Sequence, residues 1–198
     1  MISIYKIKPK FQQFLKPVLT RLYKLGVTAN QITLASIFLS LLIGIAFWNA
    51  NNWNVLFLTL PIGLFFRMGL NALDGMMART YNQQSKKGEI LNELGDVVSD
   101  VFIFFPLLKF EAHISYLIVA FICLGIVNEF AGVMSKIVSG ERRYDGPMGK
   151  SDRALVIAIY GLLQFFGVGI SNYSIYIFGI VIMLLILSTF TRLNKALK

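Results

Sequence analysis

The chain has only one cysteine and one histidine, Cys123 and His113, among its 198 residues. A single cysteine excludes an intrachain disulfide and any metal cluster built from several cysteines. Cys123 lies in the middle of a long apolar run, and His113 lies beside a turn between two such runs. We therefore expect His113 to have no catalytic role.

Acidic residues are also scarce, with 10 against 19 lysines and arginines, and the charged fraction is only 15%. Hydrophobic residues make up 56% of the chain, which is more than a soluble domain of this length can bury in its core. A net charge of +9 would indicate nucleic-acid binding only in a soluble domain with basic grooves. Attraction to anionic lipid is the simpler explanation here, so we expect membrane lipids as partners and no nucleic acid.

The apolar residues fall into six runs, each near the length that a helix needs to cross about 30 Å of hydrocarbon. No hydrophilic block is long enough to form a second domain, and about thirty polar and basic residues precede the first run, so we expect no signal peptide. The sequence predicts an all-α integral membrane protein with six transmembrane helices. Residues 1–198 form one membrane domain, in which 1–30 is a juxtamembrane segment and 31–190 a six-helix bundle. The runs are Ile32–Ala50, Trp53–Leu73, Ile90–Phe110, Ile114–Met134, Ala154–Ile170 and Ile175–Phe190.

The juxtamembrane segment has the pattern of an amphipathic N-terminal helix. Its apolar residues share one face of a helix and its basic residues share the other, as expected for a helix at the level of the lipid headgroups. A helix that simply packs against the bundle would show the same pattern, so both interpretations stay open. The apolar face contains Phe11, Phe14, Leu15, Val18, Leu19 and Leu22, and the basic face Lys10, Lys16, Arg21 and Lys24. Gly26 should end this helix, and Thr28 or Asn30 should cap the next one.

The basic residues also predict an orientation. All nineteen except Arg67 and Lys109 lie in the connections that six crossings place on one side of the membrane. By the positive-inside rule that side is the cytoplasm. We expect a protein of the cytoplasmic membrane whose termini and active site both face the cytoplasm.

Polar residues at helical spacing occur at the end of the second run and around the start of the third. Ionisable side chains at membrane depth are costly, so they normally face a partner, a metal ion or water. At about 100° per residue, each set of polar and small residues shares one helix face, and two such faces can close a pocket lined by carboxylates. The first set is Asn71, Asp74, Gly75 and Ala78, and the second is Glu89, Asn92, Glu93, Asp96 and Asp100.

The spacing of these residues resembles the signature of the CDP-alcohol phosphotransferase family, D-x2-D-G-x2-A-R-x8-G-x3-D-x3-D. Six positions match, with the eight-residue gap preserved, whereas asparagine replaces aspartate at the first and third acidic positions, Asn71 and Asn92. The segment from Gly26 to Thr33 also resembles the G-x-T-x-N-x-x-T sequence that precedes the first span in many members. The six matches are Asp74, Gly75, Ala78, Arg79, Gly88 and Asp96.

The resemblance implies an enzyme of phospholipid synthesis. It would transfer a phosphatidyl group from a CDP-linked lipid, such as CDP-diacylglycerol, to a small alcohol or a phosphorylated alcohol, releasing CMP. The metal would be Mg²⁺ or Mn²⁺, because such ions prefer oxygen ligands and polarise phosphoryl oxygens. Asp96 would be the general base. The implied metal ligands are Asp74, Asp96, Asn71, Asn92 and Asp100, and the implied CDP-binding residues are Asp74, Gly75, Ala78, Arg79 and Gly88.

The two asparagines leave alternatives open. Four carboxylates balance two divalent ions, but Asp74 and Asp96 alone balance one, since an asparagine oxygen contributes no charge. Glu93 and Asp100 could restore the missing charge, or a shift of one helical turn could make Asp96 and Asp100 the working pair. A catalytically degenerate lipid- or nucleotide-binding protein of the same fold is the other alternative. A membrane prenyltransferase is disfavoured, because the later half has no second aspartate-rich motif.

A second group of basic residues, between Glu141 and Arg153, lies on the predicted cytoplasmic side. The resemblance implies that basic residues at the mouth of the fifth span bind the acceptor or its phosphate, and the alternative is a positive-inside anchor. Inside the fourth span, Asn128 and Glu129 need a partner, for which Arg67 is a candidate. A homodimer is left open. The predicted acceptor-binding residues are Lys150, Arg153, Arg142 and Arg143.

Overall fold

The structure is a computed structural model that describes residues 8–198, and within this range it contains helices and no strands. The α-helices of this part are α1 (Lys8–Lys24), α2 (Ala29–Trp48), α3 (Thr59–Thr80), α4 (Lys86–Phe104), α5 (Leu107–Phe110), α6 (Ser115–Ser139), α7 (Lys150–Phe165) and α8 (Ser174–Ala196). Short 3₁₀ helices occupy Asn54–Leu58, Ala112–Ile114 and Ile170–Asn172. Residues 1–7 of the predicted juxtamembrane segment lie outside the described residues.

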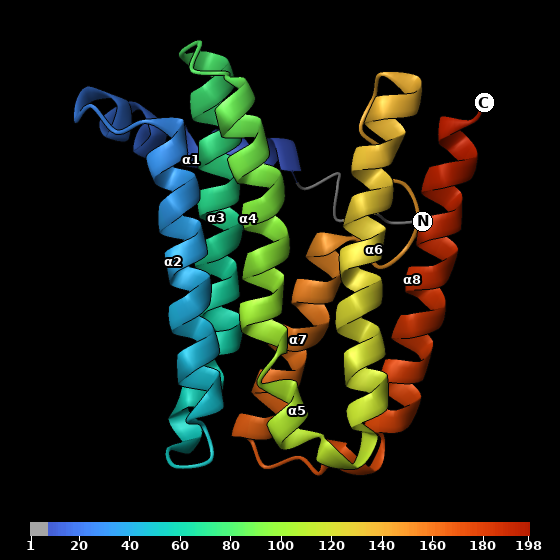
Figure 1. Cartoon of the computed structure of the whole chain (residues 1–198). Helices are drawn as coiled ribbons and strands as arrows, with labels where there is room; N and C mark the ends of the chain where they lie inside the picture. Colours follow the sequence, from blue (N-terminus) through green and yellow to red (C-terminus); the bar gives the residue numbers. More distant parts are fainter. Residues whose placement is uncertain (1–7) are drawn as a thin grey trace.

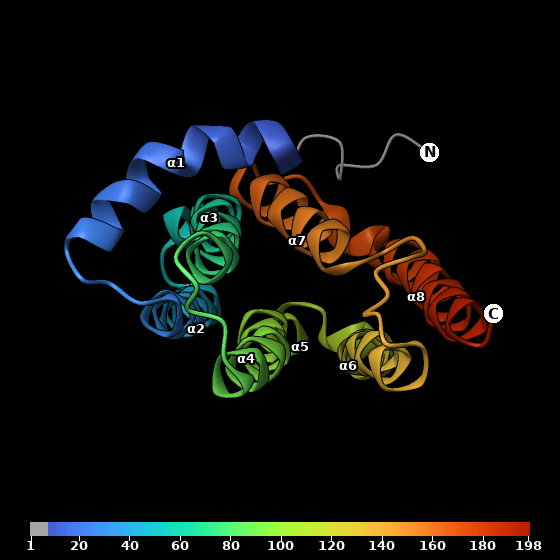
Figure 2. The same cartoon turned by 90° about the horizontal axis from the view of Figure 1, so that it is seen from above.

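The long helices α2, α3, α4, α6, α7 and α8 run along a common direction (Figure 1). Helix α2 packs against α3 and α4, and α6 pairs with α8. Helix α7 packs on α3, and the contact of α4 with α6 joins the two groups of helices. Seen from above, α1 runs along one side of the bundle, next to α3 (Figure 2).

Four helical segments within residues 8–198 are long and apolar enough to cross a membrane: Ala29–Trp48, Asn54–Thr80, Ala112–Ser139 and Ser174–Ala196. The predicted third and fifth spans correspond to α4 and α7, which are not among these four. Helix α4 carries six charged residues, and α7 has only 16 residues, with three charged residues in its first turn. Six spans therefore remain a prediction, although α4 and α7 run alongside the four apolar helices (Figure 1).

The helices extend beyond the predicted apolar runs at one end of the bundle. Helix α3 continues seven residues past Leu73 to Thr80, and α6 continues from Met134 to Ser139. Helix α4 begins at Lys86, four residues before its apolar run. The extensions of α3 and α4 carry Asp74, Arg79 and Gly88 of the signature, so these residues lie on helices and not in loops.

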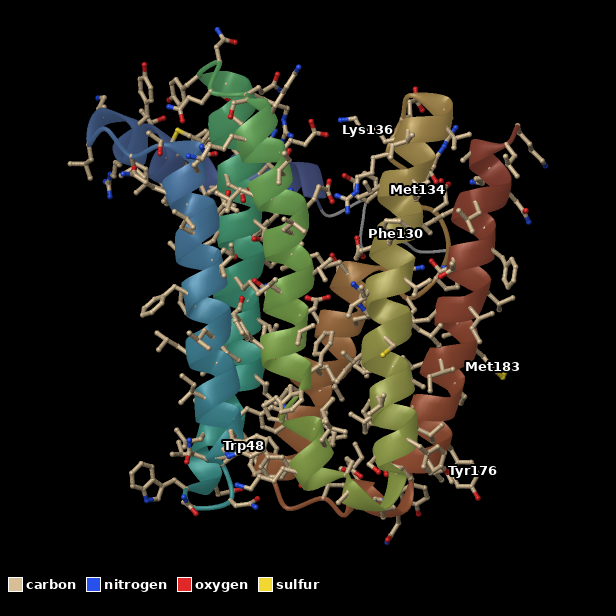
Figure 3. The ribbon with its side chains drawn as sticks, viewed as in Figure 1. Trp48, Phe130, Met134, Lys136, Tyr176 and Met183 are labelled. Atoms are coloured by element: carbon tan, nitrogen blue, oxygen red, sulfur yellow. The ribbon has the colours of Figure 1, made fainter. Side chains whose placement is uncertain are left out.

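The opposite end of the bundle carries exposed aromatic residues. Trp48 and Tyr176 lie at this end, whereas Lys136 lies towards the other end (Figure 3). Trp48 is 43% exposed and Tyr176 is 69% exposed. Tryptophan and tyrosine are enriched where a membrane helix meets the headgroup region, so this end has the character of a membrane boundary.

Helix α1 packs on the bundle through part of its apolar face. Leu15 and Leu19 are buried in a small apolar cluster with residues of α2 and α3, including Leu73. Phe14 and Val18 from the same predicted face are exposed. The apolar face of α1 is thus wider than its contact with the bundle, and its placement at the headgroup level remains a prediction.

The start of α2 confirms one predicted cap. Gly26 has a φ of +77° after the end of α1. Thr28 is the N-cap of α2: its hydroxyl accepts a hydrogen bond from the Gln31 amide, and the Gln31 side chain accepts one from the Thr28 amide. This reciprocal pair is a capping box. The other candidate cap, Asn30, lies in the first turn of α2 and is not the cap.

Two glycines in long helices provide a test of the α3–α7 packing. A Cβ at Gly161 of α7 would lie 2.8 Å from the Phe57 carbonyl oxygen and 2.8 Å from the Leu60 Cβ, whereas a Cβ at Gly179 of α8 would meet nothing within 4 Å. Alanine favours a helix over glycine by about 1 kcal/mol, but overpacking costs about 1–3 kcal/mol. We expect Gly161→Ala to lower the melting temperature in detergent and Gly179→Ala to preserve or raise it. Equal effects of the two substitutions would contradict this packing.

Candidate active site

A polar cavity of about 770 Å³ lies where α2, α3, α4, α6 and α7 meet the loops of the basic end. It brings together ten of the thirteen residues predicted for metal, CDP or acceptor binding. These ten are Asn71, Asp74, Gly75, Ala78, Arg79, Gly88, Asn92, Asp96, Arg142 and Lys150. The other three, Asp100, Arg143 and Arg153, do not line the cavity.

The connection between α3 and α4 determines which faces of these helices line the cavity. It spans only residues 81–85, and Ser85 caps α4 by accepting a hydrogen bond from the Gly88 amide at 3.0 Å. The Gln83 side chain in this turn accepts a hydrogen bond from the Ala29 amide at 2.7 Å, which ties the turn to the start of α2. A short and anchored turn keeps the two signature faces side by side.

Helix α2 supports the first half of the signature through two hydroxyl groups. Thr33 donates a hydrogen bond to Asp74 Oδ2 at 3.0 Å, and Ser36 donates one to Asn71 Oδ1 at 2.7 Å. Thr33 and Ser36 are both buried. The sequence offered one signal for this contact, because Thr33 is the last threonine of the segment that starts at Gly26. It offered no signal for Ser36.

The two glycines that match the signature, Gly75 and Gly88, have different neighbours. A Cβ at Gly88 would lie 2.7 Å from the Asn30 Oδ1 atom, so Gly88 lets α4 approach the start of α2. A Cβ at Gly75 would lie 3.3 Å from a guanidinium nitrogen of Arg79. The Arg79 side chain therefore lies over the helix surface at Gly75.

Lysines from two other helices reach the acidic residues of α4. Lys150, the first residue of α7, forms a salt bridge with Asp96, and Lys136 of α6 forms one with Glu89. Arg67 of α3 also donates a hydrogen bond to the backbone carbonyl of Asp96 at 3.3 Å. Asp96 is thus linked to both α3 and α7. Lys136 extends from α6 at this end of the bundle (Figure 3).

Asp100 lies one helical turn deeper than Asp96, in an ion-pair network that joins α3, α4, α6, α7 and α8. Both of its carboxylate oxygens are paired, one with Arg67 at 2.8 Å and the other with Arg153 at 2.9 Å. Arg67 therefore pairs with Asp100 and not, as the sequence suggested, with Asn128 or Glu129. The predicted metal-ligand role of Asp100 remains untested, but this placement favours a structural role.

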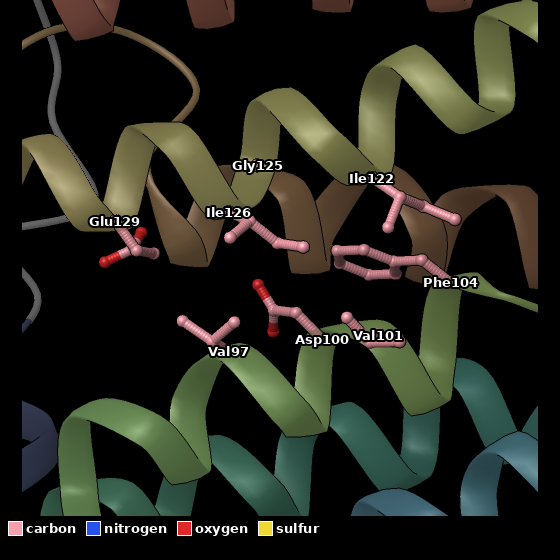
Figure 4. Close-up of a pocket in the computed structure, with 8 residues that line it drawn as sticks. All are labelled: Val97, Asp100, Val101, Phe104, Ile122, Gly125, Ile126 and Glu129. Atoms are coloured by element: carbon pink, nitrogen blue, oxygen red, sulfur yellow. The ribbon is translucent and has the colours of Figure 1, made fainter. Parts of the chain in front are cut away.

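Glu129 of α6 is the acidic centre of the other half of the network. It pairs with Arg142 at 2.9 Å, with Arg153 at 3.0 Å and with Arg192 at 3.8 Å. Arg153 and Arg192 are at most 1% exposed. Figure 4 shows Asp100 and Glu129 on the facing sides of α4 and α6, separated by apolar side chains. Arg153 is thus a bridge between these two acids, away from the cavity surface.

Arg142 occupies the border between the network and the cavity. It pairs with Glu93 at 2.8 Å and lies 4.7 Å from the centre of the Tyr144 ring. Burial alone would lower the pKa of Arg142, but Tyr144, Glu93 and Glu129 outweigh burial and raise it. Arg143, its neighbour, is 3.8 Å from Glu141 and does not line the cavity. The two adjacent arginines therefore occupy different environments.

Comparison with known proteins identifies the family. Residues 26–191 match the CDP-alcohol phosphatidyltransferase family over most of the chain. The chain belongs to this family. It is 48% identical over 161 residues to the inner membrane protein YnbA of Escherichia coli (strain K12), covering 81% of this chain and 80% of YnbA. It is 36% identical over 100 residues to the archaetidylinositol phosphate synthase of Pyrococcus horikoshii, covering half of each chain.

Solved structures of a phosphatidyltransferase share the fold. The Mycobacterium tuberculosis phosphatidylinositol phosphate synthase PgsA1, in complex with manganese and citrate, superposes with a TM-score of 0.73 at 17% identity, over 92% of this chain and 88% of that one. The same synthase with CDP-DAG bound gives a TM-score of 0.74 at 16% identity, over 93% and 94% of the two chains. At this identity the likeness concerns the helical arrangement.

The four acidic signature positions supply two carboxylates and two side-chain amides to the cavity. Among residues 8–198, no three Asp, Glu, His or Cys side chains gather in a way that could hold a metal ion. The available carboxylates at the signature positions are Asp74 and Asp96, supplemented by the amide oxygens of Asn71 and Asn92. Oxygen ligands of this kind suit Mg²⁺ or Mn²⁺, but two carboxylates balance the charge of a single such ion.

Proposed function

We propose that this protein transfers a phosphatidyl group, or a similar substituted phosphate, from a CDP-linked lipid such as CDP-diacylglycerol to an acceptor alcohol, with release of CMP. The observation that carries the proposal is the cavity that gathers the six matched signature residues. The presence of CDP-DAG in the PgsA1 structure and the activity named for the Pyrococcus relative support it.

The residues of the cavity suggest how the chain would perform this transfer. The acceptor oxygen forms a bond with the lipid-side phosphorus, the bond from this phosphorus to the CMP oxygen breaks, and Asp96 takes the proton of the acceptor hydroxyl. Gly75 and Ala78 leave room for the nucleotide against α3, and Arg79 lies beside them to neutralise the pyrophosphate. A divalent cation would be held by Asp74 with the oxygens of Asn71 and Asn92, and would polarise phosphoryl oxygens. PgsA1 was solved with manganese, which supports a metal of this class.

The acceptor would bind beside Arg142 and Lys150, because these predicted acceptor-binding residues line the cavity. A charge-assisted contact with a phosphate is stronger than a contact with a neutral hydroxyl. We expect Arg142→Ala to raise the KM of a phosphorylated acceptor about tenfold or more, and that of the CDP-lipid much less. The adjacent Arg143→Ala is the matched control and should change neither KM by more than about twofold. Equal increases for both substrates in Arg142→Ala would instead place this arginine in the donor site.

We further propose six transmembrane helices, with α4 and α7 completing the four apolar spans, and a cytoplasmic position for both termini and the cavity. The basic connections gather at the cavity end, and exposed aromatic residues gather at the other. In a Cys123→Ser background, a cysteine at Gln84 should react with an impermeant thiol reagent in inverted vesicles and resist it in intact cells. A cysteine at Ser171 should behave in the reverse way. Labelling of position 84 in intact cells would overturn this orientation.

The transfer reaction can be tested directly with purified protein. Release of radiolabelled CMP from CDP-diacylglycerol should depend on an added alcohol from a panel of free and phosphorylated polyols, and on Mg²⁺ or Mn²⁺. The alternative is a non-catalytic lipid- or nucleotide-binding protein of the same fold, which the two signature asparagines favour. Binding of CDP-lipid without CMP release under any of these conditions would support that alternative and refute the transferase proposal.

A further inference from the structure

The four acidic positions of the signature have unequal environments in this chain. Asn71 accepts a hydrogen bond from Ser36, and Asp74 accepts one from Thr33, both from hydroxyl groups of α2. Asp96 has a full positive charge beside it, the Lys150 ammonium. Among residues 8–198, no salt bridge involves Asp74. Asp74 therefore has no counter-ion within salt-bridge distance, whereas Asp96 is paired with a lysine.

Lys150 is held in this position by the start of α7. Gly149 is the N-cap, and its amide donates a hydrogen bond to Asp152 Oδ2 at 3.0 Å, which determines where the helix begins. Three residues later, Arg153 is fully buried between Asp100 and Glu129. The Lys150 side chain is only 25% exposed. Its ammonium is thus a fixed part of the cavity wall.

The two carboxylates that could compensate for the asparagines are occupied elsewhere. Glu93 pairs with Arg142, and Asp100 pairs with Arg67 and Arg153. Movement of Asp100 towards a second metal ion would leave Arg67 without a carboxylate, and movement of Glu93 would leave Arg142 with Glu129 alone. A divalent ion at Asp96 would in addition lie against the Lys150 ammonium and be repelled by it.

One divalent ion, and not two, balances the charges at the four acidic signature positions. Relative to four aspartates, Asn71 and Asn92 remove two negative charges, and the omission of one divalent ion removes two positive charges. The net charge presented to a pyrophosphate is then the same as in a site with four aspartates and two ions. When the charge of Lys150 is counted as well, Asp74, Asp96 and Lys150 carry a net charge of +1 with one divalent ion and +3 with two, so Lys150 disfavours a second ion beside the fourth acidic position.

From these contacts we propose that Lys150 is a built-in cation that replaces a second divalent ion at Asp96, and that this chain binds a single divalent ion, at Asp74. The inference rests on the proposed function for its metal requirement. It goes beyond that function in stating that Lys150 takes the place of the second of the two ions that the four-aspartate signature implies, and in giving Lys150 a role towards the donor phosphates.

The experiment is a titration of purified protein with Mn²⁺ in the absence of substrate. Electron paramagnetic resonance measures the concentration of free Mn²⁺ at each step. Wild type should bind one Mn²⁺ per chain. The triple variant Asn71→Asp, Asn92→Asp, Lys150→Met should bind two. Lys150→Met alone should bind one ion at least threefold more tightly, because a repelling charge has been removed. Lys150→Arg, which keeps the charge, should stay within twofold of wild type.

Lys136→Met is the matched control, since Lys136 lines the same cavity and also pairs with an acidic residue of α4. It should still bind one ion, with an affinity closer to wild type than that of Lys150→Met. Two Mn²⁺ per wild-type chain, or equal affinity gains in the two methionine variants, would overturn the inference while leaving the proposed function intact. Absence of Mn²⁺ binding in every variant would refute the metal requirement of the proposed function as well.

Discussion

Asp74→Ala should reduce CMP release roughly 100-fold or more, a loss of the size that follows when one group that stabilises transition-state charge is removed. Asp74 is one of two carboxylates at the four acidic signature positions, and the other, Asp96, is paired with Lys150. Its replacement therefore removes the main anchor that we propose for a metal ion. The measurement is CMP release at saturating CDP-diacylglycerol and acceptor, together with a melting curve in detergent.

The matched control for this prediction is Asp145→Ala. Asp145 lies at the same end of the molecule but outside the cavity, where it pairs with Lys195. This substitution should leave CMP release within about twofold of wild type, because a surface ion pair contributes little. A folded Asp74→Ala variant that retains near-normal turnover would show that the cavity does not use this carboxylate.

The part of the site that could be predicted from the sequence is the part determined by local geometry. The positions of Asp74 and Gly75 on one helix face follow from helical periodicity, and so do those of Asn92 and Asp96 on the next helix. The connection of five residues between α3 and α4 leaves little choice in how these faces meet. All of the residues matched to the signature therefore line one cavity.

The ion-pair network could not be predicted in the same way, because its partners are far apart in the chain. Arg153 and Asp100 are separated by 53 positions, and Arg153 and Glu129 by 24. Arg153 follows Lys150 by three residues on α7, so sequence spacing gave both the same predicted role. The structure separates them, because Lys150 lines the cavity and Arg153 is fully buried behind it.

Hydropathy and length identify four spanning helices in the described part of the chain, and α4 and α7 are not among them. Helix α4 carries the acidic half of the signature, so its composition resembles that of a soluble helix, and α7 is shorter than a typical span. Both run alongside the apolar helices because their charges pair with neighbouring helices. Arg67–Asp100 and Arg153–Glu129 are examples in which burial is made possible by a partner on another helix.

Glu129→Ala should have the largest effect on stability, because it leaves Arg192 without its carboxylate and removes one partner each from Arg142 and Arg153. Removal of one member of a buried ion pair costs about 3–5 kcal/mol, since the remaining charge stays buried without compensation. We expect a large drop in the melting temperature of the protein in detergent, and Glu129→Gln should not restore it, because it keeps the shape of the side chain without its charge.

Glu141→Ala is the matched control for the network, since Glu141 also lies within 4 Å of an arginine, Arg143, but is largely exposed. An exposed pair of this kind contributes at most about 1 kcal/mol, so the melting temperature should hardly change. If Glu129→Ala melts like Glu141→Ala, the arginines around Glu129 are stabilised by water or lipid in solution. The network would then not hold α6, α7 and α8 together. If the two variants differ as expected, ion pairs hold the helices behind the cavity together. Lys150 is then held against Asp96 by the same helix that carries Arg153.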